Sequence, residues 1–351
     1  MSESKAMILG VAGTELRADE AAFFRAERPW GFILFARNIA EAGQARALIA
    51  ALRDCVGRPD TPVFVDQEGG RVQRLRPPLA QDYPPAAALG ALHAQDRGAG
   101  LRAAWLMSRL HAFDLRRLGF NADCLPVLDV PVAGAHDVIG NRAYAREPDA
   151  VAALGRAAAE GLLAGGVLPV VKHVPGHGRA AADSHLALPC VEAPLEELRR
   201  HDFAPFRALN DMPMAMSAHV VYTALDPGAP ATTSRQVVAG IIRGEIGFDG
   251  LLMSDDVSMK ALSGDFAGRT DAIIAAGCDV VLHCNGTMDE MRAVADAAPM
   301  LRGRARERAD AALARLVPPD ATQEDAARAE FAELMSGIAV AATDGERQRI
   351  G

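Results

Sequence analysis

The chain has 351 residues, half of them hydrophobic, and a formal net charge of −8 at pH 7. This acidic balance, without a block of basic residues, argues against binding to nucleic acid or to an anionic membrane surface, since both favour basic patches. The first residues, MSESKAMILGVAG, lack the charged start and long apolar core of a signal peptide. No run of about 18 apolar residues that could span a membrane occurs. We therefore expect a cytoplasmic protein with a sizeable core.

The cysteines agree with a reducing compartment. Their number is odd, and their spacing fits neither a zinc ribbon nor a disulfide framework. Several lie in apolar runs, which is typical of reduced thiols in a core. They are Cys55, Cys124, Cys190, Cys278 and Cys284.

Eight short apolar runs recur along the chain. Each is nearly continuous in apolar residues, as in strands that are buried on both faces of a parallel sheet. Most of the segments between them are rich in Ala, Leu and Arg at helical spacing, so that strands and helices alternate. The runs cover residues 6–13, 31–38, 61–69, 121–130, 166–174, 212–220, 250–257 and 278–285.

This alternation predicts an α/β protein, and eight strands in a chain of this length predict a (β/α)8 barrel of the TIM type. The barrel is expected to form one catalytic domain over residues 1–300, with an open doubly wound sheet as the alternative. Residues 301–351 are expected to add helices that pack on the barrel, with a frayed end over 343–351. Neither a G-x-G-x-x-G between a strand and a helix nor a G-x-x-x-x-G-K-[ST] occurs, so a nucleotide cofactor has little support.

Polar and ionisable residues end almost every apolar run. Because a barrel gathers the carboxyl ends of its strands on one face, we expect a common site there. Polar residues are common wherever a strand ends at the surface. A surface position alone, however, explains less well why these endings are so rich in ionisable groups. The endings are Gly13, Arg37–Asn38, Asp66–Gln67–Glu68, Asp129, Lys172–His173, Ser217 with His219, Asp255–Asp256 and Asn285.

Adjacent carboxylates end the seventh run, in SDDVSM. Neighbouring side chains of a strand point to opposite faces, so only one of Asp255 and Asp256 can point along the barrel axis. A carboxylate held there can be a nucleophile, a base or a metal ligand, whereas the other can cap the helix that follows. We expect one to act in catalysis and the other to support it.

The stretch KHVPGHGRAAADSHLALP places three histidines, a lysine and an aspartate around two glycines. His173 and His177 have the spacing of a zinc pair on a helix, but Pro175 and the glycines disfavour a helix, which weighs against a metal site. Asp183 and His185 lie on one side of an extended backbone, where the carboxylate can orient the imidazole. The small residues around them indicate a mobile loop that can bring His185 over a substrate, with an ordinary surface loop as the alternative.

Arginines follow two further strand ends. In DQEGGRVQR, Asp66 ends a run, and Arg71 and Arg74 follow a glycine pair. Carboxylate and guanidinium groups in this arrangement suit a hydroxyl-rich or anionic ligand, because both make paired hydrogen bonds. In VIGNRAY, Arg142 lies in the loop after the fourth run.

Together and in this order, VDQEGGRVQR, IGNRAY, KHVPGHG with DSH, and SDDVSM resemble the motifs of glycoside hydrolase family 3. More narrowly, they are similar to those of its single-domain bacterial β-N-acetylglucosaminidases. The resemblance runs from GFILFARN to CDVVLHCN, and the combination is specific although each motif alone is not. The chain departs from the pattern at Val174 and Val257, where Phe and Leu are usual, and at Asp123–Cys124. These departures bear on substrate detail and not on the type of reaction.

The resemblance implies a retaining hydrolase of peptidoglycan recycling in the cytoplasm. Its substrate would be N-acetylglucosamine linked to 1,6-anhydro-N-acetylmuramic acid, with or without a peptide. Asp255 would be the nucleophile, His185 the acid/base and Asp183 its partner. We expect a monomer that uses no cofactor or metal and binds neither nucleic acid nor a membrane. The sugar-binding residues implied are Asp66, Arg74, Arg142, Lys172, His173 and, with a weaker match, His219.

Alternatives remain open at this point. A metal-dependent barrel hydrolase would use the histidines and Asp255 as ligands. A non-catalytic sugar-binding barrel would keep Asp66 and Arg74, although Asp255 together with the DSH stretch speaks against it. Within the family, a β-glucosidase or a β-xylosidase is the alternative activity.

Overall fold

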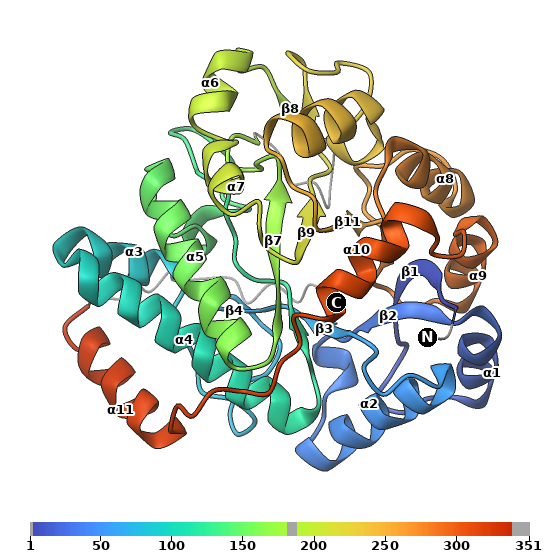
Figure 1. The fold of residues 1–351 in the computed structure, drawn as a ribbon, viewed down its shortest axis with the longest axis horizontal. Helices are drawn as coiled ribbons and strands as arrows, with labels where there is room; N and C mark the ends of the chain where they lie inside the picture. The colour runs from blue at the N-terminus through green and yellow to red at the C-terminus, as the bar shows by residue number, and fades with distance from the viewer. Residues whose placement is uncertain (1–2, 181–187, 339–351) are drawn as a thin grey trace.

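The computed structural model describes residues 3–180 and 188–338, which form a closed barrel of eight parallel strands ringed by helices (Figure 1). Each apolar run supplies one strand, so the predicted (β/α)8 fold is confirmed and the open doubly wound sheet is wrong. Around the barrel the order is β1-β12-β11-β9-β7-β6-β3-β2. The strands are β1 (Lys5–Gly10), β2 (Pro29–Ile33), β3 (Val63–Val65), β6 (Ala122–Asp123), β7 (Leu168–Val174), β9 (Met214–Ser217), β11 (Leu251–Asp256) and β12 (Val280–His283).

The helices form the outer layer. Local sequence sets several of their ends: Asp96 caps the start of α4 by accepting the N–H of Ala99, and Gly119 ends it in the left-handed conformation. The segment Gln236–Glu245, η4, is a π-helix. The α-helices are α1 (Ala18–Glu27), α2 (Ala42–Val56), α3 (Ala86–Gln95), α4 (Arg97–Leu118), α5 (Pro148–Ala164), α6 (Leu195–Arg200), α7 (Ala204–Ala208), α8 (Phe266–Ala276), α9 (Met288–Ala297), α10 (Gly303–Leu313) and α11 (Glu324–Met335). Among the described residues, no helix is long and apolar enough to cross a membrane.

Alternate side chains of the strands fill two apolar layers. Phe64 and Val170 lie in the cluster inside the barrel. Their neighbours Val65 and Val171 lie in the larger cluster between the barrel and the helices. Burial of an apolar side chain of this size contributes about 1.5–3 kcal/mol, so both layers stabilise the strands and hold their ends in fixed positions.

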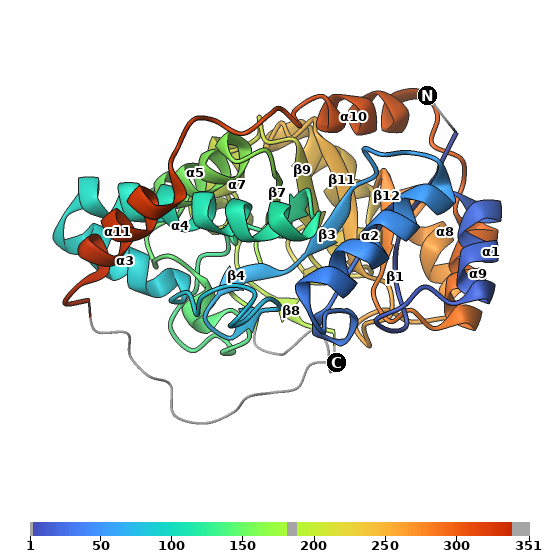
Figure 2. The ribbon, with the colours of Figure 1, turned by 90° about the horizontal axis from the view of Figure 1, so that it is seen from below.

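The two ends of the barrel differ. Figure 2 shows α10 across one end and the short strands β4 (Gln67–Gly69) and β8 (Cys190–Val191) at the other. Ala309 and Ala312 of α10 are buried in the cluster inside the barrel, so this helix covers the end at which the strands begin. The opposite end, where the strands finish, is therefore the one open to loops that carry function.

The last described helix, α11, packs beside α4 (Figure 1). Arg102 of α4 pairs with Glu330 at 2.7 Å, and Arg328 of α11 pairs with Asp114 at 2.8 Å. We propose that the chain from residue 301 onward is an extension of a single barrel domain. The fraying expected over 343–351 lies outside the described residues.

All eight barrel strands are shorter than their apolar runs, and local sequence accounts for two of these differences. The run 61–69 ends as a barrel strand at Val65, and its last residues form an antiparallel hairpin of β4 with β5 (Val72–Gln73). Gly69 and Gly70 allow that turn because both have positive φ, 93° and 59°. The run 121–130 forms only the short strand β6, which stops before Pro126, a residue without an N–H for the ladder.

Candidate active site

Several of the sequence-predicted site residues meet where the strands finish. Asp66 follows β3, Lys172 and His173 belong to β7, and Asp255 belongs to β11. Arg142 ends the short 3-10 helix η2 (Gly140–Arg142), in the loop between β6 and α5. The contacts between them decide how this end of the barrel is built.

The core of the site is a row of alternating charges, which we call the charge ladder: Arg74, Asp66, Lys172, Glu68 and Arg142. Arg74 Nη2 lies 3.1 Å from Asp66 Oδ2, and Lys172 Nζ lies 2.9 Å from Asp66 Oδ1. Lys172 Nζ also contacts Glu68 Oε1 at 2.7 Å. Arg142 closes the row with two hydrogen bonds to Glu68, each of 2.8 Å. Three cations thus enclose two carboxylates, and the ladder as a whole carries one positive charge.

The residues of the ladder differ in how deeply their side chains are buried. The side chains of Lys172 and Glu68 are 2% and 4% exposed, whereas those of Asp66, Arg74 and Arg142 keep 12–17%. The two enclosed residues therefore hold the geometry. The three partly exposed ones retain surface that a ligand can contact.

The ladder fixes the ionisation of its members. Burial raises the pKa of both carboxyls, but nearby cations outweigh it. Lys172 and Arg74 bring the pKa of Asp66 well below its usual range, and Arg142 and Lys172 bring that of Glu68 to about 2. Burial alone would lower the pKa of Lys172, but the Asp66 and Glu68 carboxylates raise it. Asp66, Glu68 and Lys172 are therefore charged at neutral pH.

Gln67 ties the two arms of the hairpin together beneath the ladder. Its side-chain Oε1 accepts the backbone N–H groups of Arg74 and Leu75, each at 3.0 Å, and its Nε2 donates to Leu75 O at 3.0 Å. The ladder residues that flank Gln67 are consequently held at a fixed distance from Arg74.

Asp129 is a second buried carboxylate at the site. Its Oδ2 lies 2.7 Å from His173 Nδ1, and its Oδ1 accepts the backbone N–H of His177 at 2.6 Å. Burial raises its pKa, but His173 and the other bonds bring that pKa to about 2. Burial lowers the pKa of His177 to about 4. Asp129 thus orients His173 and anchors the VPGHG turn.

The adjacent carboxylates Asp255 and Asp256 have different surroundings. Asp256 Oδ1 accepts the N–H groups of Ser258 at 3.0 Å and Cys284 at 3.2 Å, and its Oδ2 accepts the Ser258 hydroxyl. Asp256 is therefore part of the turn after β11 and joins that turn to the end of β12. Asp255 Oδ1 accepts the backbone N–H of Asp256 at 2.8 Å. The bonds of Asp256 give it a supporting position in the turn after β11.

His219 is fully buried between two strand ends. Its Nδ1 lies 2.9 Å from Thr232 Oγ1, and its Nε2 lies 3.0 Å from the backbone oxygen of Asp256. Burial lowers its pKa. His219 supports the turn after β11, and a direct bond to a sugar would require one of these two contacts to break.

Asp183 and His185 lie outside the described residues, which stop at Ala180 and resume at Leu188. The chain just before this gap is well held. Ala180 O accepts the N–H of His136 at 2.9 Å, and Gly176 O accepts the hydroxyl of Tyr222 at 2.6 Å.

Glu68 and Asp129 were missed as site residues by reading the sequence. Both were visible as polar strand ends, and Glu68 stands two residues after Asp66 in DQEGG. The sequence does not show which residue each of them pairs with. Arg142, the partner of Glu68, is 74 residues away, and His173, the partner of Asp129, is 44 residues away. Such pairings follow from the closed barrel and not from local spacing.

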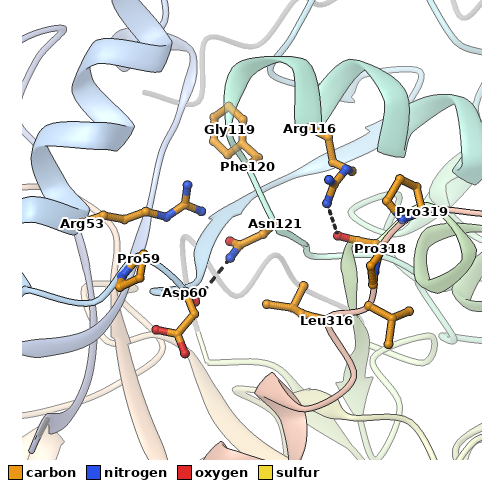
Figure 3. A pocket seen from close by; sticks show the side chains of 12 residues that line it. Arg53, Pro59, Asp60, Arg116, Gly119, Phe120, Asn121, Leu316, Pro318 and Pro319 are labelled. Atoms are coloured by element: carbon orange, nitrogen blue, oxygen red, sulfur yellow. Dashed lines mark hydrogen bonds between the residues drawn. The ribbon is translucent and has the colours of Figure 1, made fainter. Parts of the chain in front are cut away.

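A separate hollow lies at the opposite end of the barrel (Figure 3). It has a volume of about 540 Å³ and is lined by Arg53, Arg116 and Asn121, among others. Arg116 and Asn121 are committed to the backbone oxygens of Gly166 and Asp60. None of the residues lining this hollow belongs to the sequence motifs, so the chemistry is to be sought at the charge ladder.

Comparisons with known proteins identify the family of the chain. The chain matches the glycosyl hydrolase family 3 N terminal domain over residues 3–318. It is 41% identical over 284 residues to a beta-hexosaminidase of Pseudomonas aeruginosa, a match that covers 80% of this chain and 82% of that protein. Its fold is similar to that of NagZ from Neisseria gonorrhoeae in complex with N-trifluoroacetyl-D-glucosamine, with a TM-score of 0.82, 32% identity and coverage of 96% and 97%. A glycoside hydrolase family 3 beta-N-acetylglucosaminidase from Paenibacillus sp. str. FPU-7 has a TM-score of 0.78 and 31% identity, and the match covers 97% of this chain and 64% of that one.

The ladder predicts a stability that depends on pH. The pKa of Glu68 is about 2 in the folded chain and about 4.3 when unfolded. Its contribution is therefore complete above about pH 4.3 and is lost as the pH falls toward 2. Glu68→Gln should lower the free energy of unfolding at pH 7 by about 3–5 kcal/mol, because it strands buried cations. Urea unfolding at pH 7 and at pH 3 should show the variant losing less stability on acidification than the wild type, and equal losses would contradict the assignment.

Proposed function

Because the chain belongs to glycosyl hydrolase family 3 and is a β-N-acetylhexosaminidase, we propose that it removes N-acetylglucosamine from peptidoglycan fragments by a retaining mechanism. The observation that carries the proposal is the charge ladder, which lies at the end of the barrel where β11 also finishes. Its partly exposed carboxylate and guanidinium groups can accept from and donate to the hydroxyl groups of one sugar unit. The similar NagZ structure was solved with a derivative of D-glucosamine, which supports a sugar of this class.

The proposed reaction has two displacements. Asp255 attacks the anomeric carbon and forms a covalent bond to it, while His185 gives its proton to the leaving oxygen. His185 then takes a proton from a water molecule, which attacks the same carbon and releases Asp255. Two inversions give net retention. The bonds that commit Asp256 to the neighbouring turn support Asp255 as the nucleophile.

The acid/base role of His185 needs a group that titrates near neutral pH. An unperturbed histidine has a pKa of about 6.5, so it can be protonated in the first step and neutral in the second. We propose that Asp183 orients the imidazole and stabilises its positive charge, as the DSH stretch implies. In the binding of N-acetylglucosamine we assign Asp66, Arg74 and Arg142 to the hydroxyl and amide groups of the sugar, with His173 beside them. We propose that Lys172, which Asp66 and Glu68 enclose, acts in binding by holding these carboxylates.

The proposed setting is the cytoplasm and the proposed substrate is N-acetylglucosamine linked to 1,6-anhydro-N-acetylmuramic acid, with or without a peptide. All five cysteines are free, which suits a reducing compartment. We propose that the enzyme acts on this small substrate as a monomer.

The substrate class predicts a strong dependence on the 2-acetamido group. The nitrophenyl N-acetyl-β-glucosaminide should be hydrolysed with a kcat/KM at least about 100-fold above that of the nitrophenyl β-glucoside, because polar groups built for the amide lose their partners with glucose. Initial rates on the matched pair measure this ratio. A chelator should leave both rates unchanged. Equal rates would favour the β-glucosidase alternative, and loss of activity with the chelator would favour a metal-dependent hydrolase.

The nucleophile is predicted to be Asp255. Asp255→Ala should lose nearly all turnover with an unchanged circular dichroism spectrum. A 5-fluoro N-acetylglucosaminyl donor should label Asp255 of the wild-type enzyme, and peptide mass spectrometry locates the label. Asp256→Asn is the matched control, since it should lower the melting temperature while the label stays on Asp255. A label on Asp256 or elsewhere would show that the nucleophile is a different residue.

The acid/base is predicted to be His185. A nitrophenolate leaves readily without a proton, whereas a sugar alkoxide does not. His185→Ala should therefore lose about 10²–10⁴-fold on a disaccharide and much less on the nitrophenyl substrate. Azide should accelerate the variant on the nitrophenyl substrate and yield a β-glycosyl azide. Equal losses on both substrates, with no azide product, would assign the proton to another group.

A further inference from the structure

Asp123 is a buried carboxyl that the proposed mechanism does not use. It lies in β6 between Ala122 and Cys124, which belong to the cluster inside the barrel. Because side chains of a strand alternate, Asp123 faces outward, toward α4. It is 0% exposed.

One oxygen of Asp123 contacts the strand end that carries the charge ladder. Its Oδ1 accepts the backbone N–H of Gln67 at 3.0 Å. Gln67 stands between Asp66 and Glu68, and its side chain holds the backbone of Arg74. This single bond therefore sets the position of three ladder residues.

The other oxygen of Asp123 faces His111 of α4. Asp123 Oδ2 and His111 Nδ1 are 4.0 Å apart, and both residues are 0% exposed. Within the described part of the chain, neither this oxygen nor either nitrogen of His111 has a hydrogen-bond partner. The ladder cation Lys172 is committed to Asp66 and Glu68. Buried polar atoms without partners cost about 1–3 kcal/mol each, which favours an arrangement in which these two groups satisfy each other.

We propose that Asp123 is a positioning residue for the sugar-binding ladder and that it acts as a neutral carboxylic acid. Its Oδ1 holds Gln67, and its Oδ2–H donates to the neutral imidazole of His111, which a small rotation of either side chain brings within hydrogen-bond distance. The pair thus links α4 to the end of β3.

The electrostatics of the region agree with a neutral pair. Burial raises the pKa of Asp123 well above its usual range, and burial lowers the pKa of His111 to about 3. An ionised Asp123 would add a third negative charge beside Asp66 and Glu68 and would neutralise the ladder. As a neutral acid, Asp123 adds no charge. The ladder then keeps the net positive charge of its three cations and two carboxylates.

The test compares Asp123→Asn with Asp123→Ala. The amide keeps an oxygen for Gln67 and a donor for His111, so Asp123→Asn should keep KM for the nitrophenyl substrate and the inhibition constant of N-acetylglucosamine within about threefold. Asp123→Ala removes both bonds and should raise both constants about tenfold, with a smaller change in kcat. If the alanine variant does not fold, His111→Phe tests the same link and should raise the inhibition constant at least threefold.

Asp279→Ala is the matched control. Asp279 is also buried and also accepts a backbone N–H of a neighbouring strand, that of Leu252 at 2.8 Å, but it precedes β12 at the other end of the barrel. It should lower the melting temperature and leave KM unchanged. The proposal is overturned if Asp123→Asn loses as much as Asp123→Ala, which would require an ionised carboxylate. It is also overturned if neither Asp123→Ala nor His111→Phe shifts the constants beyond the control.

This inference rests on the proposed role of the ladder in binding the sugar, and the two can fail separately. Asp66→Ala and Arg74→Ala should each weaken inhibition by N-acetylglucosamine about tenfold or more. If they do not, the proposed sugar site is wrong. If they do while the Asp123 and His111 variants behave as the control does, only the positioning role is wrong.

Discussion

The Lys172 ammonium is the group on which the rest of the site depends. It lies between two carboxylates, 2.9 Å from Asp66 and 2.7 Å from Glu68, and is almost fully buried. Two carboxylates this close to one another would not both ionise without a cation between them. Lys172 is carried by β7, whereas Asp66 and Glu68 follow β3, and β6 lies between these strands. The ion pairs therefore fix the positions of three strand ends relative to one another. Burying the ammonium costs desolvation free energy, which the attraction of its two carboxylate partners offsets.

Around this cation the protein separates support from chemistry. Glu68, Asp129 and Asp256 are each held by several bonds to neighbouring groups, and these bonds fix a loop, a histidine and a turn. Asp66 and Arg74 keep part of their surface exposed. Preorganised groups of this kind would need no rearrangement in the proposed binding of a sugar.

The sequence was sufficient for the barrel but only for part of the site. Eight apolar runs with polar endings predict the fold because nearly continuous apolar runs are typical of strands that are buried on both faces of a parallel sheet. Asp66, Arg74, Arg142 and Lys172 could be selected from their motifs. Glu68 and Asp129 could not, because their partners are brought to them by strand closure, and Leu128 reaches β7 through a bond to Lys172 O that no local pattern encodes. The distinction between Asp255 and Asp256 likewise depends on Cys284, which comes from the next strand.

The most direct test of the account is a crystal structure of the enzyme with N-acetylglucosamine bound. The account predicts one sugar at the end of the barrel where the strands finish, with its hydroxyl groups within about 3.2 Å of Asp66 and Arg74. Its anomeric carbon should face Asp255, and Lys172 and Glu68 should stay in contact. A sugar bound in the hollow beside Arg53 and Arg116, or one at the strand ends that makes no bond to Asp66 or Arg74, would contradict it.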